Sequence, residues 1–134
     1  MSNLTTKIRN MLKNDAVFTS SGSSALILSL KALNLPKESE VLIPAYCCSN
    51  VPFSILVCNL KPVFVDINIE TLLFDKESLK SSLSKNTAAV IGIHPFGRSM
   101  DLDFISNFAR ENEIVFIEDF CQSFGGVFQN KLHG

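Results

Sequence analysis

Five short apolar runs alternate with segments of helical periodicity along this chain of 134 residues. The runs lie at residues 16–19, 41–43, 63–65, 88–93 and 114–117. Strands that alternate with helices through short connections usually lie parallel and are joined by right-handed crossovers. The pattern therefore predicts an α/β fold in which a mainly parallel sheet lies between two layers of helices, a three-layer α-β-α arrangement.

The last apolar run belongs to the stretch 114–122, which ends in polar side chains. Glu118 and Asp119 follow the run directly, and Gln122 comes shortly after them. A continuous apolar run is typical of a strand buried on both faces of a parallel sheet. Ligands of open α/β sheets bind beyond the carboxyl ends of the strands, so we expect Asp119 and Gln122 to face a small molecule.

The spacing of apolar residues predicts five helices, at residues 3–14, 22–33, 51–59, 75–83 and 102–112. Asp75 and Asp101 stand where N-caps are expected for the last two. Small residues and Ser hydroxyls around Gly22 begin the second helix. Free backbone N–H groups and the positive end of the helix dipole would attract an anion there, whereas the simpler alternative is an ordinary Ser N-cap.

The length corresponds to one domain with its own core. We expect a leading helix in residues 1–14, the alternating core in residues 15–122, and a small hairpin in residues 123–134. The connection at residues 68–74 is expected to be irregular.

Composition and charge exclude several classes of protein. Hydrophobic residues make up 46% and charged residues 19%, which is typical of a compact domain rather than a disordered chain. The 12 basic residues are balanced by 13 acidic ones, which leaves no basic face for nucleic acid. Neither a membrane-spanning segment nor a secretory signal is expected, so the predicted location is cytoplasmic, with reduced cysteines. The spacing of the four cysteines does not predict a metal site.

Three features are predicted to meet at one edge of the sheet: the helix start at residues 22–25, the turn at residues 45–50, and Asp119 with Gln122. An anion site and a carboxylate suit a phosphorylated heterocycle better than a dinucleotide. A pyridinium nitrogen needs a fixed carboxylate to stay protonated, and a phosphate tail needs backbone donors some distance away. Pyridoxal 5′-phosphate meets both demands.

Six segments, in register from about residue 15 to residue 134, resemble the DegT/DnrJ/EryC1/StrS family of nucleotide-sugar aminotransferases, which belong to the fold type I pyridoxal phosphate enzymes. Residues 21–26 resemble S-G-T-x-A-L, 40–44 resemble E-V-I-x-P, 62–66 resemble P-V-F-V-D, 94–97 resemble H-x-[FY]-G, 101–103 resemble D-M-D, and 117–123 resemble I-E-D-A-A-Q-A. The resemblance implies a partial large domain of a fold type I aminotransferase.

The resemblance also implies roles for individual residues. Asp119 pairs with the pyridine nitrogen of the cofactor, and Gln122 contacts the ring hydroxyl. An aromatic residue usually stacks on the cofactor ring, but this sequence has Cys48 in register and Tyr46 two residues earlier, so either could lie against the ring. The phosphate would be held at the helix start by the group Gly22, Ser23 and Ser24.

The resemblance implies an enzyme that transfers an amino group to a nucleotide-linked keto-sugar in polysaccharide biosynthesis, with glutamate as the expected donor. It also implies that the enzyme is a homodimer. The family's Schiff-base lysine corresponds to a position beyond Gly134, so no catalytic residue is assigned and this chain alone is expected to be inactive. The alternative is a catalytically dead binding or assembly module that associates with itself or with a full-length paralogue.

The sequence contains two histidines, neither of which is predicted to be catalytic. His94 follows an apolar run, where a structural hydrogen bond is favoured over a catalytic role, and His133 is expected to be solvated. Two other folds fit less well. A phosphoacceptor domain would need an acidic pair after the first strand, and a dinucleotide-binding fold would need G-x-G-x-x-G after it.

Overall fold

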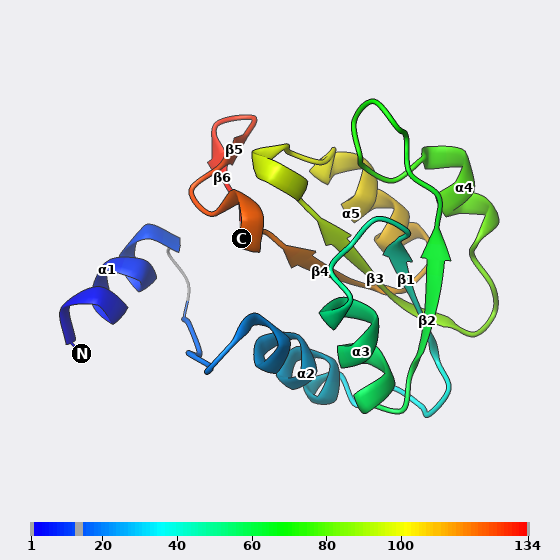
Figure 1. Ribbon diagram of the computed structural model, residues 1–134, viewed down its shortest axis with the longest axis horizontal. Coiled ribbons are helices and arrows are strands. Elements are labelled where there is room, and N and C mark those ends of the chain that lie inside the picture. The colour runs from blue at the N-terminus through cyan, green and yellow to red at the C-terminus, as the bar shows by residue number, and fades with distance from the viewer. Residues whose placement is uncertain (1, 13–14, 134) are drawn as a thin grey trace.

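The computed structural model describes residues 2–12 and 15–133, and its centre is a four-stranded parallel sheet (Figure 1). The strand order is β2-β1-β3-β4. The strands are β1 (Glu40–Pro44), β2 (Lys61–Val65), β3 (Thr87–Ile93) and β4 (Val115–Asp119). Every neighbouring pair is parallel, so the carboxyl ends of all four strands lie at one edge of the sheet.

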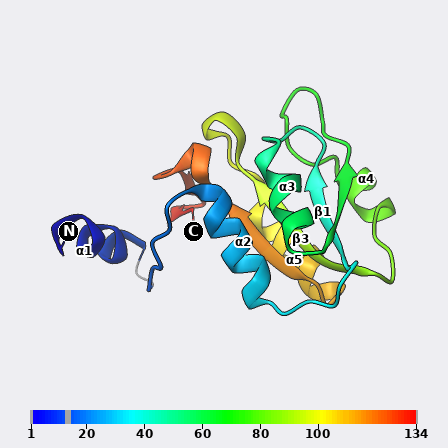
Figure 2. The same cartoon turned by 60° about the horizontal axis from the view of Figure 1, so that its bottom comes forward.

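Helices cover both faces of the sheet, which confirms the three-layer prediction (Figures 1 and 2). One face carries α2 (Gly22–Ala32) and α3 (Asn50–Val57), and the other carries α4 (Lys76–Ser81) and α5 (Leu102–Glu111). Successive strand residues point to opposite faces. Within β1, Val41 and Ile43 therefore pack with α2 and α3, whereas Leu42 between them packs with α4 and α5.

The predicted helices are confirmed, with ends that differ by a few residues. The leading helix is α1 (Ser2–Leu12); the last two residues of its predicted range lie outside the described residues. Asp75 caps α4 by accepting a hydrogen bond from the backbone N–H of Ser78, and Asp101 caps α5 by accepting one from Phe104. These caps satisfy donors that a helix N-terminus otherwise leaves free.

One predicted strand does not form, and another is less buried than expected. Residues 16–19 form no strand, because no neighbouring strand lies beside them to complete the backbone hydrogen bonds, and Val17 is 79% exposed. The strand β4 was expected to be buried on both faces, but all its residues are only half-buried. It is the edge strand of the sheet, with β3 as its one partner among the described strands.

After β4 the chain forms one short 3₁₀ helix and a hairpin. The 3₁₀ helix η2 (Cys121–Ser123) leads to β5 (Val127–Phe128) and β6 (Lys131–Leu132), which pair antiparallel. Gln129 and Asn130, at the hairpin tip, both have positive φ, as a two-residue type I′ loop requires. His133, expected to be solvated, is 1% exposed, because its ring stacks on that of His94 and contacts the hydroxyls of Ser99 and Ser123.

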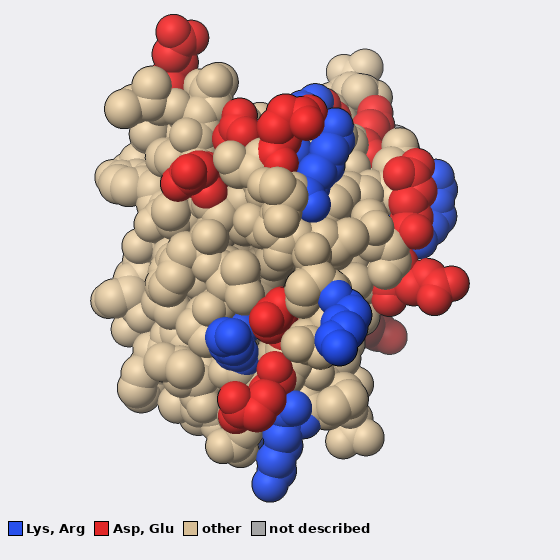
Figure 3. Space-filling model, turned by 90° about the vertical axis from the view of Figure 1, so that its right-hand side faces the viewer, with Lys and Arg blue, Asp and Glu red and all other residues tan. Residues whose placement is uncertain are grey.

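Charged side chains of both signs are interspersed on the face shown in Figure 3. Ion pairs join Lys61 to Glu40, Lys76 to Asp101, and Lys80 to Glu77. No basic patch forms on this face. Within the described ranges, no helix combines the length and apolar character that a membrane crossing requires.

Candidate functional site

The start of α2 lies toward the carboxyl edge of the sheet, the edge to which the end of β4 also leads (Figures 1 and 2). Core packing agrees with this placement. Leu26, one turn into α2, and Ile117, near the end of β4, pack against the same cluster of buried residues. The start of α2 and Asp119 therefore both lie toward the carboxyl edge of the sheet, and their joint role in holding a cofactor stays a prediction.

Serine hydroxyls form hydrogen bonds at the start of α2. The Oγ of Ser21 accepts a hydrogen bond from the backbone N–H of Ser24 at 3.1 Å, so the ordinary N-cap also exists. The backbone N–H groups of Gly22 and Ser23 have no hydrogen-bond partner among the described residues. A Cβ added at Gly22 would meet nothing within 4 Å, so the space on the side-chain side of this residue is open. Free N–H groups at a helix N-terminus bind anions.

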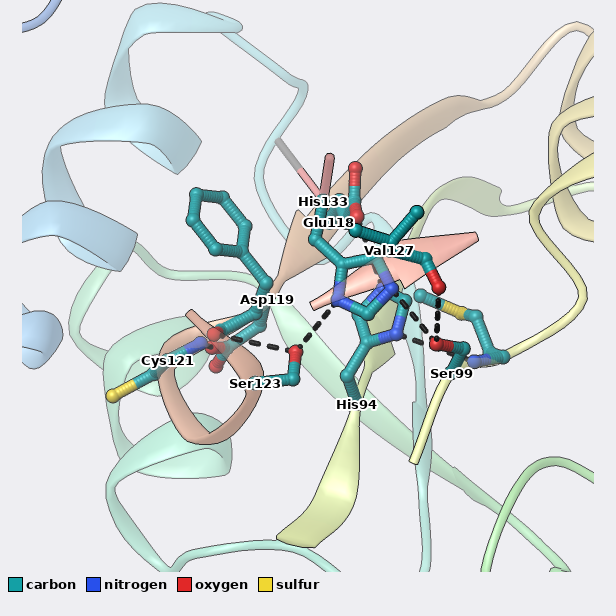
Figure 4. A network of polar contacts seen from close by, with 10 residues as sticks. His94, Ser99, Glu118, Asp119, Cys121, Ser123, Val127 and His133 are labelled. Carbon is teal, nitrogen blue, oxygen red and sulfur yellow. Dashed lines mark hydrogen bonds and ion pairs between the residues drawn. The ribbon is translucent and has the colours of Figure 1, made fainter. Parts of the chain in front are cut away.

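Asp119 ends β4 with a half-buried carboxylate (Figure 4). One oxygen, Oδ1, accepts a hydrogen bond from the backbone N–H of Cys121 at 3.0 Å, so Asp119 also caps the turn that follows. The other oxygen has no partner among the described residues. Gln122 is exposed, and its Oε1 accepts a hydrogen bond from the backbone N–H of Phe96 at 3.0 Å.

The loop after β1 carries Tyr46, Cys47 and Cys48. Cys47 packs against the same buried cluster as Leu26; burial raises the pKa of its thiol, and the charges of Cys48 and Asp119 raise it further. Cys48 is exposed rather than part of the core. Which of Tyr46 and Cys48 would lie against a bound ring stays a prediction.

Tyr46 lies toward the other face of the sheet. Its ring centroid is 6.2 Å from that of Phe96, with an angle of 47° between the planes. It also lines a cleft of about 720 Å³ between the loop at residues 68–75 and the segment after β3. The other walls include Phe74, Met100 and Phe104, and none of the other residues predicted to bind cofactor lines this cleft.

A buried polar network, which the sequence did not predict, supports the ends of β3 and β4 (Figure 4). The Nε2 of His94 lies 3.0 Å from Glu118 Oε1, while its Nδ1 accepts a hydrogen bond from the backbone N–H of Met100. Nδ1 therefore carries no proton, and Nε2 donates to Glu118. The structural role favoured for His94 agrees with these bonds.

His133 extends this network. Its Nδ1 lies 2.9 Å from the hydroxyl of Ser123, and its Nε2 lies 2.9 Å from that of Ser99. A Cβ added at Gly126 would lie 2.7 Å from the His133 ring, so the ring passes directly against that backbone. A Gly next to a strand can mark such a close approach, and the pair Gly125 and Gly126 was the local signal in the sequence.

The parallel sheet with helices on both faces matches part of the large domain of fold type I enzymes that use pyridoxal phosphate. A profile of the DegT/DnrJ/EryC1/StrS aminotransferase family matches residues 3–134, and the chain belongs to that family. Its relatives are pyridoxal phosphate-dependent sugar aminotransferases and dehydratases, which confirms the family resemblance and the cofactor at the level of the family.

Individual relatives support this assignment. The chain is 35% identical to GDP-4-keto-6-deoxy-D-mannose 3-dehydratase of Escherichia coli O55:H7 over 125 residues, which are 89% of this chain and 32% of the relative. It is 29% identical to GDP-perosamine synthase of Vibrio cholerae, over 89% of this chain and 32% of the relative. The chain thus spans about a third of the length of these relatives.

Solved structures agree. The E. coli GDP-4-keto-6-deoxy-D-mannose-3-dehydratase with bound hydrated PLP superposes with a TM-score of 0.88 at 32% identity, over 96% of this chain and 35% of that one. The structure of ntda from Bacillus subtilis with bound cofactor pmp gives 0.86 at 29% identity, over 94% of this chain and 29% of that one.

Proposed function

We propose that this chain is the amino-terminal part of a sugar aminotransferase or related dehydratase, and that it holds the ring and the phosphate of pyridoxal phosphate. One observation carries the proposal: the free N–H groups of Gly22 and Ser23 and the unpaired oxygen of Asp119 lie at the same edge of the sheet. A phosphate and a pyridinium nitrogen need these two kinds of group, some distance apart.

Each residue has a specific part. The carboxylate of Asp119 would accept a hydrogen bond from the pyridinium nitrogen and would keep that nitrogen protonated. The donors of Gly22 and Ser23, with the hydroxyl of Ser24, hold the phosphate. Gln122 contacts the ring hydroxyl, and Tyr46 or Cys48 lies against the ring. When bound, the cofactor supplies an electron sink for bonds to the substrate's amino-bearing carbon.

In the complete enzyme, the reaction we propose moves an amino group from an amino acid, with glutamate as the expected donor, to a nucleotide-linked keto-sugar in polysaccharide biosynthesis. The complete enzyme is expected to be a cytoplasmic homodimer. No lysine is assigned to the site formed by this chain, so we expect no turnover from it alone. Measurable amino transfer by the purified chain would contradict that expectation.

The cofactor site is tested by titrating the protein with pyridoxamine 5′-phosphate, which has no aldehyde to react with surface lysines. Asp119→Asn should weaken binding by roughly ten- to a hundredfold, because a charge-assisted hydrogen bond is lost. Asp66→Asn is the matched control, since Asp66 is exposed and follows a different strand. Equal affinity in the wild type and Asp119→Asn would refute the site.

A second candidate role, as a binding or assembly module, has its own supporting observation. The outer side of α3 exposes large apolar side chains, with Phe53 and Leu56 both 58% exposed. An apolar patch of this kind favours association with a second copy or with a full-length relative.

Light scattering after size exclusion tests the assembly role. Leu56→Lys should reduce association, whereas Ile69→Lys, in the exposed loop before α4, should leave it unchanged. A monomer at every concentration, in the wild type as well, would count against this role.

A further inference from the structure

A strained turn lies directly after β3. The backbone N–H of Arg98 donates to the carbonyl oxygen of Pro95 at 2.9 Å and closes the turn. Its two central residues have positive φ, 52° at Phe96 and 77° at Gly97, the pattern of a type I′ turn. Asn or Gly usually occupies the first central position, because a bulky side chain is disfavoured in the left-handed region. Phe96 is therefore an unusual residue at this position.

The turn is attached to the segment that carries the proposed cofactor site. The backbone N–H of His94, just before the turn, donates to the carbonyl oxygen of Asp119 at 3.0 Å. The backbone N–H of Phe96 donates to Oε1 of Gln122 at 3.0 Å. The two segments thus lie side by side, and the turn presents the N–H of Phe96 to the Gln122 side chain.

This contact decides which way the Gln122 amide points. A backbone N–H can only donate, so the atom that it contacts must be the amide oxygen. The amide nitrogen then lies on the other side, and it has no hydrogen-bond partner among the described residues. The oxygen of the Gln122 amide is therefore engaged by Phe96, and the two N–H groups of its nitrogen are free to donate.

We propose that Phe96 is a positioning residue that holds Gln122 as a hydrogen-bond donor toward the ring hydroxyl of the cofactor, an inference that rests on the function proposed above. A donor at this position stabilises the deprotonated ring oxygen. The pair Phe96 and Gln122 therefore selects ligands that carry an oxygen at this position of the ring over otherwise identical ligands that lack it.

The first arm of the test uses the protein without cofactor and measures amide hydrogen exchange of Phe96 by NMR. Gln122→Met removes the acceptor and should speed exchange about tenfold, the usual effect of losing one hydrogen bond. Gln122→Glu keeps an acceptor oxygen and should stay within about twofold of the wild type. Gln129→Met, in the exposed hairpin tip, is the matched control. Unchanged exchange in Gln122→Met would overturn the proposal.

The second arm compares the affinities for pyridoxamine 5′-phosphate and its 3-deoxy analogue. The wild type should prefer the hydroxylated ligand by about tenfold. Gln122→Glu should lose this preference, because its carboxylate cannot donate. Phe96→Gly keeps both the N–H and access to positive φ, so it should retain the preference, whereas Phe96→Pro, which loses both, should not.

The outcomes separate this inference from the proposed function. Equal preference in the wild type and Gln122→Glu would overturn the donor role while the cofactor site stands. If the wild type binds neither ligand, the proposed function fails, and amide exchange alone decides whether Phe96 positions Gln122. If Phe96→Pro does not fold, Phe96→Gly and the Gln122 variants still give the answer.

Discussion

The imidazole rings of His94 and His133 are stacked, with centroids 4.0 Å apart and an angle of 25° between their planes. His94 follows β3, and His133 follows the hairpin β5–β6, so the stack fastens the hairpin to the carboxyl edge of the sheet. The hydrogen bond from Ser123 to His133 links the same hairpin to η2, next to Gln122. The two rings thus support the segment on which the proposed site depends.

The stability of the protein should depend on the protonation of His133. Burial lowers the pKa of His133 below its ordinary value of 6.5, and His94 lowers it further, although Glu118 and Ser123 act in the opposite direction. The unfolded chain therefore binds more protons than the folded chain below pH 6.5. We expect the contribution of His133 to be complete above pH 6.5 and to be lost as the pH falls toward the lowered pKa. Urea titrations across this range measure it.

His133→Gln is the control for this pH dependence, because an amide can still bond the two serines but does not titrate. The free energy of unfolding of this variant should fall less steeply with decreasing pH than that of the wild type. Identical slopes in the two proteins would show that His133 is not the group responsible.

Gly126→Ala should destabilise the hairpin. The added Cβ would lie 2.7 Å from the His133 ring and 2.8 Å from the carbonyl oxygen of Ser123, and the second of these is backbone. Overpacking of this kind costs about 1–3 kcal/mol. Gly22→Ala is the matched control, since its Cβ would meet nothing within 4 Å. Thermal unfolding of the two variants compares them, and equal midpoints would argue against close packing at Gly126.

The parts of the fold that local patterns determine were predictable from the sequence. Asp75 and Asp101 act within one helical turn, and the apolar runs of β1 to β4 carry their own signal, so these elements were found. The run at residues 16–19 has the same signal but forms no strand, because a strand also needs a partner. Partial exposure of β4 likewise depends on its place in the sheet order, which no local pattern encodes.

The candidate site was predictable to a similar degree. Asp119 and Gln122 were located because they follow a strand, and strand ends meet at one edge of a parallel sheet. The hydrogen bond from Phe96 to Gln122 was not predictable, since it depends on a backbone dihedral angle. Burial of His133 was missed because the rings of His94 and His133 meet only through tertiary packing.

The N-cap of α5 allows a capping effect to be separated from an ion pair. Asp101 accepts a hydrogen bond from the Phe104 N–H and also pairs with Lys76 at 2.8 Å. Both interactions lower the pKa of Asp101, and the hydrogen bond from Lys76 has the larger effect. Asp101→Ala should cost about 0.5–2 kcal/mol. Lys76→Ala removes only the exposed pair and should cost about 0–1 kcal/mol. Urea unfolding measures both, and equal losses would mean that the cap contributes little.

Two consecutive residues of α3 should respond very differently to truncation. Ile55 is completely buried between α2 and the sheet, whereas its neighbour Leu56 is largely exposed. Ile55→Ala leaves a cavity in the core and should lower the free energy of unfolding by about 2–5 kcal/mol. Leu56→Ala should change it by less than about 0.5 kcal/mol. If Leu56→Ala instead destabilises the protein in a concentration-dependent way, the outer side of α3 is buried in an assembly, and the monomeric packing of this helix is not the state in solution.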